Sequence, residues 1–87
     1  MTIQNELIGK TMKILTEWNP LGSKAKTITD LDNYRTEAID ILFSVKLGRD
    51  KPAVIIRRVL NQAFDLSLSL EECTAAGNQL QELINKT

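Results

Sequence analysis

Apolar side chains recur every three or four residues along four segments of the chain, and this spacing limits the fold more than any other feature. In the first segment the apolar residues fall on one half of a helical wheel: Ile3, Leu7, Ile8, Met12, Ile14, Leu15 and Trp18. Helix-breaking or capping residues separate the segments, namely Asn19-Pro20, Gly48, Asp50-Lys51-Pro52 and Ser69. We therefore predict helices over about 3–18, 30–47, 51–65 and 70–86.

The chain has 87 residues, enough for one hydrophobic core, because a domain of this size buries only about 60–65% of its unfolded surface. The prediction is an all-α fold: a compact, four-helix bundle-like single domain over residues 1–87. Residues 22–29 are polar and predict a surface loop. Residues 64–70 alternate in polarity, but a lone strand has no partner, so we interpret them as an extended connector that ends at a capping box, Ser69 to Glu72.

The chain contains no histidine and one cysteine, Cys73. This composition excludes Ser-His and Cys-His catalytic pairs, histidine-ligated zinc and an internal disulfide. Cys73 lies on the apolar face of the last segment and is expected in the core. We predict no catalytic residue, no metal site and no cofactor, and hence a protein that is not an enzyme.

One pair of carboxylates leaves an enzymatic alternative open. Glu37 and Asp40 are three residues apart on one predicted helix face, a spacing suited to Mg²⁺. All-α nucleotide pyrophosphatases of the MazG type are partly similar, with Glu-x-x-Glu on one helix and Glu-x-x-Asp on the next. Here the first half is missing, because the preceding segment has only Glu6 and Glu17.

Eleven basic and eleven acidic residues cancel, so the chain has no overall charge that would attract nucleic acid or a membrane. A basic cluster around Gly48 superficially resembles a helix-turn-helix, but a neutral domain lacks the footprint of a DNA-binding protein. No segment has the ~20 apolar residues that span a bilayer, and the first residues lack the features of a signal peptide. We expect a cytoplasmic protein with no nucleic-acid or membrane partner.

Charge is nevertheless uneven along the chain, since residues 27–45 carry one arginine and four acids. This block predicts an acidic face for a protein partner, with apolar side chains as anchors. The candidate interface consists of Asp30, Asp32, Tyr34, Glu37, Ile39, Asp40, Phe43 and Leu47. Core packing is the alternative for Tyr34. For Ile39, Phe43 and Leu47, contact with another helix or a homodimer is the alternative.

The turn Trp18-Asn19-Pro20-Leu21-Gly22, followed by Tyr34, Glu37, Asp40-Ile41, Phe64 and Leu70-Glu71-Glu72-Cys73, resembles the YugE-like family of small bacterial proteins of unassigned function. That family more often has Asp at the position of Asn19. The resemblance implies a four-helix fold and a cytosolic bacterial protein, and it implies no reaction.

Small helical proteins without histidine or a catalytic constellation also look like the immunity proteins of antibacterial toxins, including those of contact-dependent growth inhibition. Such proteins bind a cognate toxin domain, which for a nuclease has a basic substrate-binding surface. We therefore expect a non-enzymatic protein-binding module that neutralises such a toxin. The alternatives are an uncharacterised YugE-like cytosolic protein and a MazG-like Mg²⁺-dependent pyrophosphatase.

Overall fold

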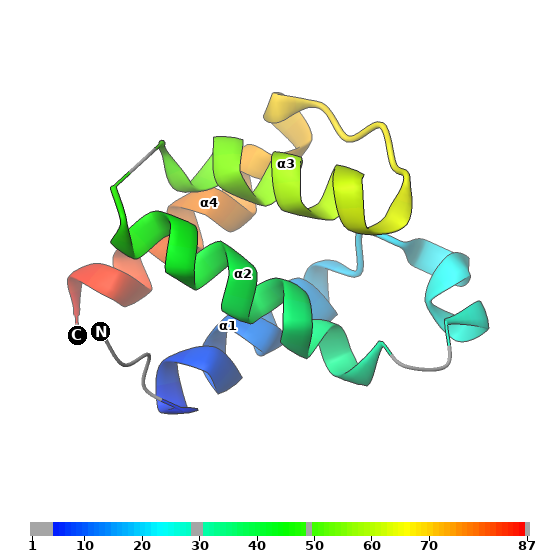
Figure 1. Cartoon of the computed structure of the whole chain (residues 1–87), viewed down its shortest axis with the longest axis horizontal. Coiled ribbons are helices and arrows are strands. Elements are labelled where there is room, and N and C mark those ends of the chain that lie inside the picture. Colours follow the sequence, from blue (N-terminus) through cyan, green and yellow to red (C-terminus); the bar gives the residue numbers. More distant parts are fainter. Residues whose placement is uncertain (1–4, 29–30, 49, 87) are drawn as a thin grey trace.

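Four α-helices account for most of the chain (Figure 1). The computed structural model describes residues 5–28, 31–48 and 50–86, and it contains no strand in these ranges. The helices are α1 (Asn5–Trp18), α2 (Arg35–Lys46), α3 (Pro52–Phe64) and α4 (Leu70–Asn85). Two 3₁₀ helices, η1 (Gly22–Thr27) and η2 (Asp32–Tyr34), lie between α1 and α2. The all-α prediction is confirmed. The predicted helix starts at residues 3 and 30 lie outside the described residues, but the second helix begins only at Arg35, because Asp32, Asn33 and Tyr34 have positive φ.

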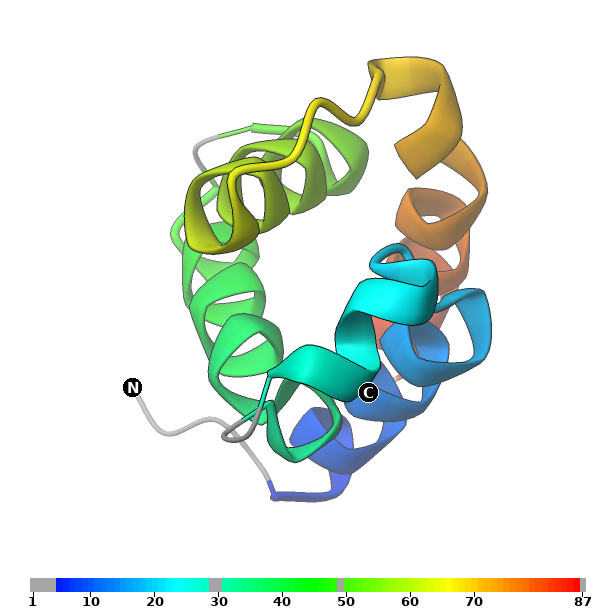
Figure 2. The same cartoon turned by 90° about the vertical axis from the view of Figure 1, so that its right-hand side faces the viewer.

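The helices form a ring in which each packs against two others. α1 contacts α2 and α4, and α3 contacts the same two helices. Figure 2 shows this ring, with η1 and η2 crossing one end of it. Leucine and isoleucine side chains from all four helices fill the core, together with Tyr34 and Cys73. No helix in the described ranges is long and apolar enough to cross a membrane.

The helix ends follow local chemistry. Pro52 occupies the first turn of α3, where its missing N–H costs nothing. At the start of α4 the Glu72 N–H donates to Ser69 Oγ over 3.1 Å, and the Ser69 hydroxyl donates to Glu72 Oε1 over 3.2 Å. The first bond confirms Ser69 as the predicted N-cap and satisfies one backbone donor of the first turn. The second differs from a full capping box, because the Glu72 carboxylate accepts from the Ser69 hydroxyl and not from its backbone N–H.

The loop predicted over residues 22–29 contains the 3₁₀ helix η1. The connector between α3 and α4 is extended, as predicted, and Leu66 and Leu68 pack against the core. Asn61 holds it in place: its Nδ2 donates to the Leu68 carbonyl over 3.2 Å, and its Oδ1 accepts from the Leu68 N–H over 2.9 Å. The Asn61 side chain thus pairs with the backbone N–H and carbonyl of Leu68, which in a β-sheet would bond to a neighbouring strand.

Helices α3 and α4 approach most closely at Gly77. A Cβ atom added there would lie 2.8 Å from the Ala53 backbone nitrogen and 2.9 Å from its Cα. Because the neighbouring atoms belong to backbone, no rotamer change relieves such a contact. Gly77 is therefore required by the packing of the two helices, and not by its own backbone conformation.

Candidate interaction surface and adjoining pocket

Helix α2 exposes two large apolar side chains one turn apart. Phe43 is 50% exposed and Leu47 is 63% exposed. They lie on the side of α2 opposite the fully buried Ala38, Ile41 and Leu42. We call Phe43 and Leu47 the α2 patch. Ile39, which the sequence groups with them, is half-buried and packs against the core, so the apolar surface is confined to the last two turns of the helix.

Opposite charges border the two sides of the α2 patch. At 100° per residue, the exposed Asp40 lies on one side of Phe43 and Leu47, and the exposed Lys46 lies on the other. The predicted acidic face is therefore only one edge of this surface. Counting charge in sequence blocks missed the basic edge, because Lys46 follows the acidic block in the chain.

The remaining predicted interface residues do not join this patch. Tyr34 is a correction: only 2% of it is exposed, so it is a core residue and not a surface anchor. Glu37 is half-buried and lines a pocket described below, and Asp32 is exposed on η2. Asp30 lies outside the described residues.

The turn after α1 is connected to Tyr34 by hydrogen bonds. The Tyr34 hydroxyl donates to Asn19 Oδ1 over 3.0 Å and accepts from the Leu21 N–H over 3.4 Å. Asn19 also donates from Nδ2 to the Gly22 carbonyl over 3.3 Å. Asn19 and Gly22 both have positive φ, of 50° and 59°, which Asn and Gly adopt most readily. These bonds and backbone conformations explain the Trp18–Gly22 turn. We call the two hydrogen bonds of the Tyr34 hydroxyl, to Asn19 and Leu21, the Tyr34 latch.

Tyr34 itself has a left-handed backbone, with φ of 65° and ψ of 27°. This conformation is uncommon for a bulky residue and separates η2 from α2. The ring of Tyr34 packs edge-to-face against Phe64 with centroids 6.1 Å apart. The strained backbone is therefore held by burial, the aromatic contact and the latch together.

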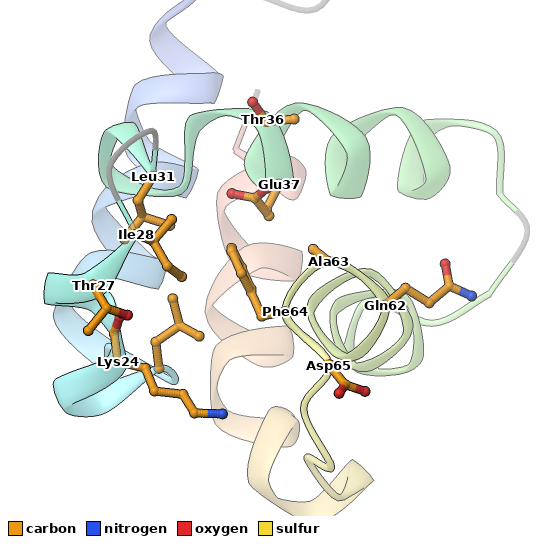
Figure 3. A pocket seen from close by; sticks show the side chains of 11 residues that line it. Lys24, Thr27, Ile28, Leu31, Thr36, Glu37, Gln62, Ala63, Phe64 and Asp65 are labelled. Atoms are coloured by element: carbon orange, nitrogen blue, oxygen red, sulfur yellow. The ribbon is translucent and has the colours of Figure 1, made fainter.

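A pocket of about 600 Å³ adjoins the latch, between η1, the start of α2 and the end of α3 (Figure 3). Leu21, Ile28, Leu31 and Phe64 provide its apolar lining. Lys24, Glu37 and Asp65 add charged groups from three different segments. The sequence gives no signal for this pocket, since Lys24 and Asp65 read as ordinary surface residues 41 positions apart.

The two carboxylates of the enzymatic alternative are neighbours at i,i+3 on α2, but they border different features. Glu37 lines the pocket, whereas Asp40 borders the α2 patch and is absent from the pocket lining. Within the described ranges no three His, Cys, Asp or Glu residues are grouped so that they could hold a metal ion. Cys73 is fully buried, as expected of a core residue.

The Cys73 thiol and the Tyr34 hydroxyl are both buried, and their pKa values predict how the stability of the fold depends on pH. Burial raises the pKa of Cys73 above its ordinary 9.0, with a further contribution from Glu72. Burial also raises the pKa of Tyr34 above 10.0, and Glu37 adds to this shift. The folded protein holds these protons at a pH where the unfolded chain has lost them. We therefore expect the free energy of unfolding, measured by urea titration, to fall as the pH rises through about 9–10.

Cys73→Ala provides the control for this pH dependence. The variant should be less stable at pH 7, but its stability should decline less steeply above pH 9 than that of the wild type. A wild-type stability that increases over this range would contradict the burial argument.

Four helices around one core and a partly exposed apolar helix face place the chain among small all-α domains. A family model described as a domain of unknown function (DUF1871) matches residues 10–87, and the chain belongs to this family. The matched region contains the Trp18–Gly22 turn, the α2 patch and the pocket. No curated protein and no solved structure matches the chain. The family match confirms neither the YugE-like nor the toxin-immunity resemblance.

Proposed function

We propose that the protein is a non-enzymatic protein-binding module, and specifically a cytoplasmic immunity protein that binds and neutralises a cognate antibacterial toxin. The observation that carries the proposal is the α2 patch. Phe43 and Leu47 are two of three large apolar side chains exposed in the described ranges, and they lie on adjacent turns of one helix. Exposing these two side chains together adds nothing to the stability of a folded monomer. A partner protein that buries them gains binding energy.

The α2 patch can supply a large part of a binding energy. Full burial of a Phe or Leu side chain contributes about 1.5–3 kcal/mol. Because Phe43 and Leu47 are already half and one third covered, their remaining surface contributes about 2–3 kcal/mol together, or roughly 30–150-fold in Kd. Interfaces commonly concentrate their affinity in a few such central side chains.

The charged edges give the partner an orientation. Asp40 on one side and Lys46 on the other favour a partner whose basic surface meets Asp40 and whose acidic groups meet Lys46. The substrate-binding surface of a nuclease toxin is basic. The acidic edge would face that surface and speed the encounter, while the apolar pair holds the complex.

Growth rescue tests this proposal. The proposal predicts that a neighbouring gene encodes the toxin, and this toxin domain would be expressed with the wild-type protein, with a Phe43→Ser/Leu47→Ser variant, or with Leu70→Ser. Leu70 is 43% exposed at the start of α4 and serves as a matched control outside the patch. We expect rescue by the wild type and by Leu70→Ser, and loss of rescue by the double variant.

Two results would contradict the proposal. One is the absence of rescue, and of any complex, with the wild-type protein. The other is a wild-type homodimer in sedimentation that the double variant dissociates, since the α2 patch would then serve self-association.

A further inference from the structure

We propose that the groove between α1 and α4 is a second interaction surface, which takes an arginine side chain of a partner protein onto Trp18. Trp18 begins the turn that the sequence singles out, but the Tyr34 latch uses only Asn19 and Leu21 of that turn. The Trp18 ring packs partly against the core and lines the groove with the rest of its surface. The groove shares no residue with the α2 patch.

Helices α1 and α4 lie side by side, with the end of α1 beside the start of α4 (Figure 2). Between them is a hollow of about 250 Å³, which we call the Trp18 pocket. Its apolar walls are Ile14, Trp18, Ala75 and Ala76. A second hollow of about 250 Å³ shares Ile14 and Gln79 with the Trp18 pocket, so the groove continues along both helices.

The size of the groove favours a protein segment as its occupant. The Trp18 pocket lies below the range of roughly 300–1,000 Å³ that is usual for small-molecule sites, and it is about as large as one large amino-acid residue. The second hollow leaves room for the next residue of the same segment. A protein segment can therefore occupy the whole groove, with one long side chain in the Trp18 pocket.

Two carboxylates border the Trp18 pocket, Glu17 from α1 and Glu72 from α4. Among the described residues, no basic side chain lines this pocket. The lining residues are also distant along the chain from the residues that the structure does not describe, the closest being Gln79, eight positions before Thr87. The charges that border the pocket therefore favour a cationic side chain.

Both carboxylates already have partners in the protein, but these partners leave them available. The Glu17 carboxylate lies 4.0 Å from Lys13 Nζ, and both side chains are mostly exposed, so this ion pair contributes little and a ligand can replace it. The Glu72 carboxylate accepts from the Ser69 hydroxyl, which is neutral and leaves its charge in place. Even when Lys13 is counted, the pocket keeps one negative charge.

An arginine matches this arrangement better than a lysine. Its planar guanidinium can stack on the Trp18 ring and still has donors at its edge for a carboxylate from each helix. An ammonium group is more strongly hydrated and has no flat face to stack. Because Trp18 packs against the core, its ring is held in place before binding, and ordering it costs little.

Trp18 is the only tryptophan in the chain, so its fluorescence reports on this pocket. The full chain would be titrated at constant ionic strength with three capped tripeptides, which carry arginine, citrulline or lysine between two alanines. Citrulline has nearly the shape of arginine but no charge. We expect a saturable change with the arginine peptide, with a Kd of roughly 1–30 mM for a side chain of about seven heavy atoms. The citrulline peptide should bind at least about fivefold more weakly, and the lysine peptide a few-fold more weakly.

Isosteric variants test the two carboxylates. Glu17→Gln and Glu72→Gln should each weaken binding of the arginine peptide by about twofold to fivefold, as expected when an exposed ion pair is removed. Glutamine keeps an oxygen that can accept from the Ser69 hydroxyl, so the start of α4 is preserved. Glu71→Gln is the matched control: it removes the same charge from the first turn of α4 outside the pocket lining, and should leave binding nearly unchanged.

Three results would overturn the proposal: no saturable fluorescence change with the arginine peptide, equally tight binding of the citrulline or lysine peptide, or a Glu71→Gln effect as large as that of Glu72→Gln. It would also fail if free arginine amide bound as tightly as the peptide, since the occupant would then be a small molecule. A wild-type dimer in sedimentation that Glu72→Gln dissociates would make a second copy of the chain the occupant. Toxin binding through the α2 patch is measured with other variants, so each proposal can fail alone.

Discussion

Replacing Gly77 by Ala should destabilise the protein by about 3 kcal/mol, the upper end of the usual cost of overpacking. The added Cβ would lie 2.8 Å from the Ala53 backbone nitrogen, so the two helices would have to move apart. This cost greatly exceeds the gain in helix propensity of about 1 kcal/mol that alanine brings. In thermal unfolding, a loss of this size lowers the Tm of a chain of this length by roughly 15 °C.

Gly9→Ala is the matched control for Gly77→Ala. Gly9 is exposed in the middle of α1, and nothing lies within 4 Å of a Cβ added there. The substitution should therefore stabilise the protein by about 0.5–1 kcal/mol. If Gly77→Ala were as stable as Gly9→Ala, the close packing of α3 on α4 would be wrong.

Replacing Tyr34 by Ala should cost about 3–5 kcal/mol, as expected when a large buried aromatic is truncated. Three effects combine: a cavity forms in the core, the contact with Phe64 is lost, and the hydrogen bonds to Asn19 and Leu21 are broken. Urea unfolding followed by circular dichroism would measure this change.

Tyr34→Phe separates the latch from the packing. It keeps the ring and removes only the hydroxyl, which leaves the Leu21 N–H and the Asn19 carboxamide without this partner, so we expect a loss of about 1–2 kcal/mol. Asn19→Asp keeps the acceptor for the Tyr34 hydroxyl and loses only the exposed bond from Nδ2 to the Gly22 carbonyl, so it should cost less than about 1 kcal/mol. A Tyr34→Phe variant as stable as the wild type would show that the latch contributes nothing.

The helices could be predicted from the sequence because their boundaries depend on a few neighbouring residues. Pro52 and Ser69 act within one turn of where they stand, and the apolar spacing between such signals identifies the buried face. The same apolar spacing predicts burial wrongly at one position. Leu70 continues the apolar row of α4, yet it is exposed, because the first turn of the helix extends beyond the core.

The site depends on contacts that no local pattern contains. Tyr34 has the spacing of a helical residue, but its left-handed backbone is imposed by the fold around it. The pocket brings together Lys24, Glu37 and Asp65 from three segments that are distant in the sequence. The basic edge of the α2 patch, by contrast, follows from helical spacing and was missed only because charge was counted in blocks. Phe43 and Leu47 do not fit the buried face of α2, so the sequence singles them out, but their spacing alone does not distinguish an exposed face from contact with another helix.

The central claim, that the α2 patch binds a toxin, is tested most directly by calorimetric titration of the purified toxin domain with the wild type, Leu47→Ser and Leu70→Ser. We expect a one-to-one complex with the wild type, a Kd about tenfold weaker for Leu47→Ser, and a change within about twofold for Leu70→Ser. No binding by the wild type, or equal weakening by the two variants, would contradict the account.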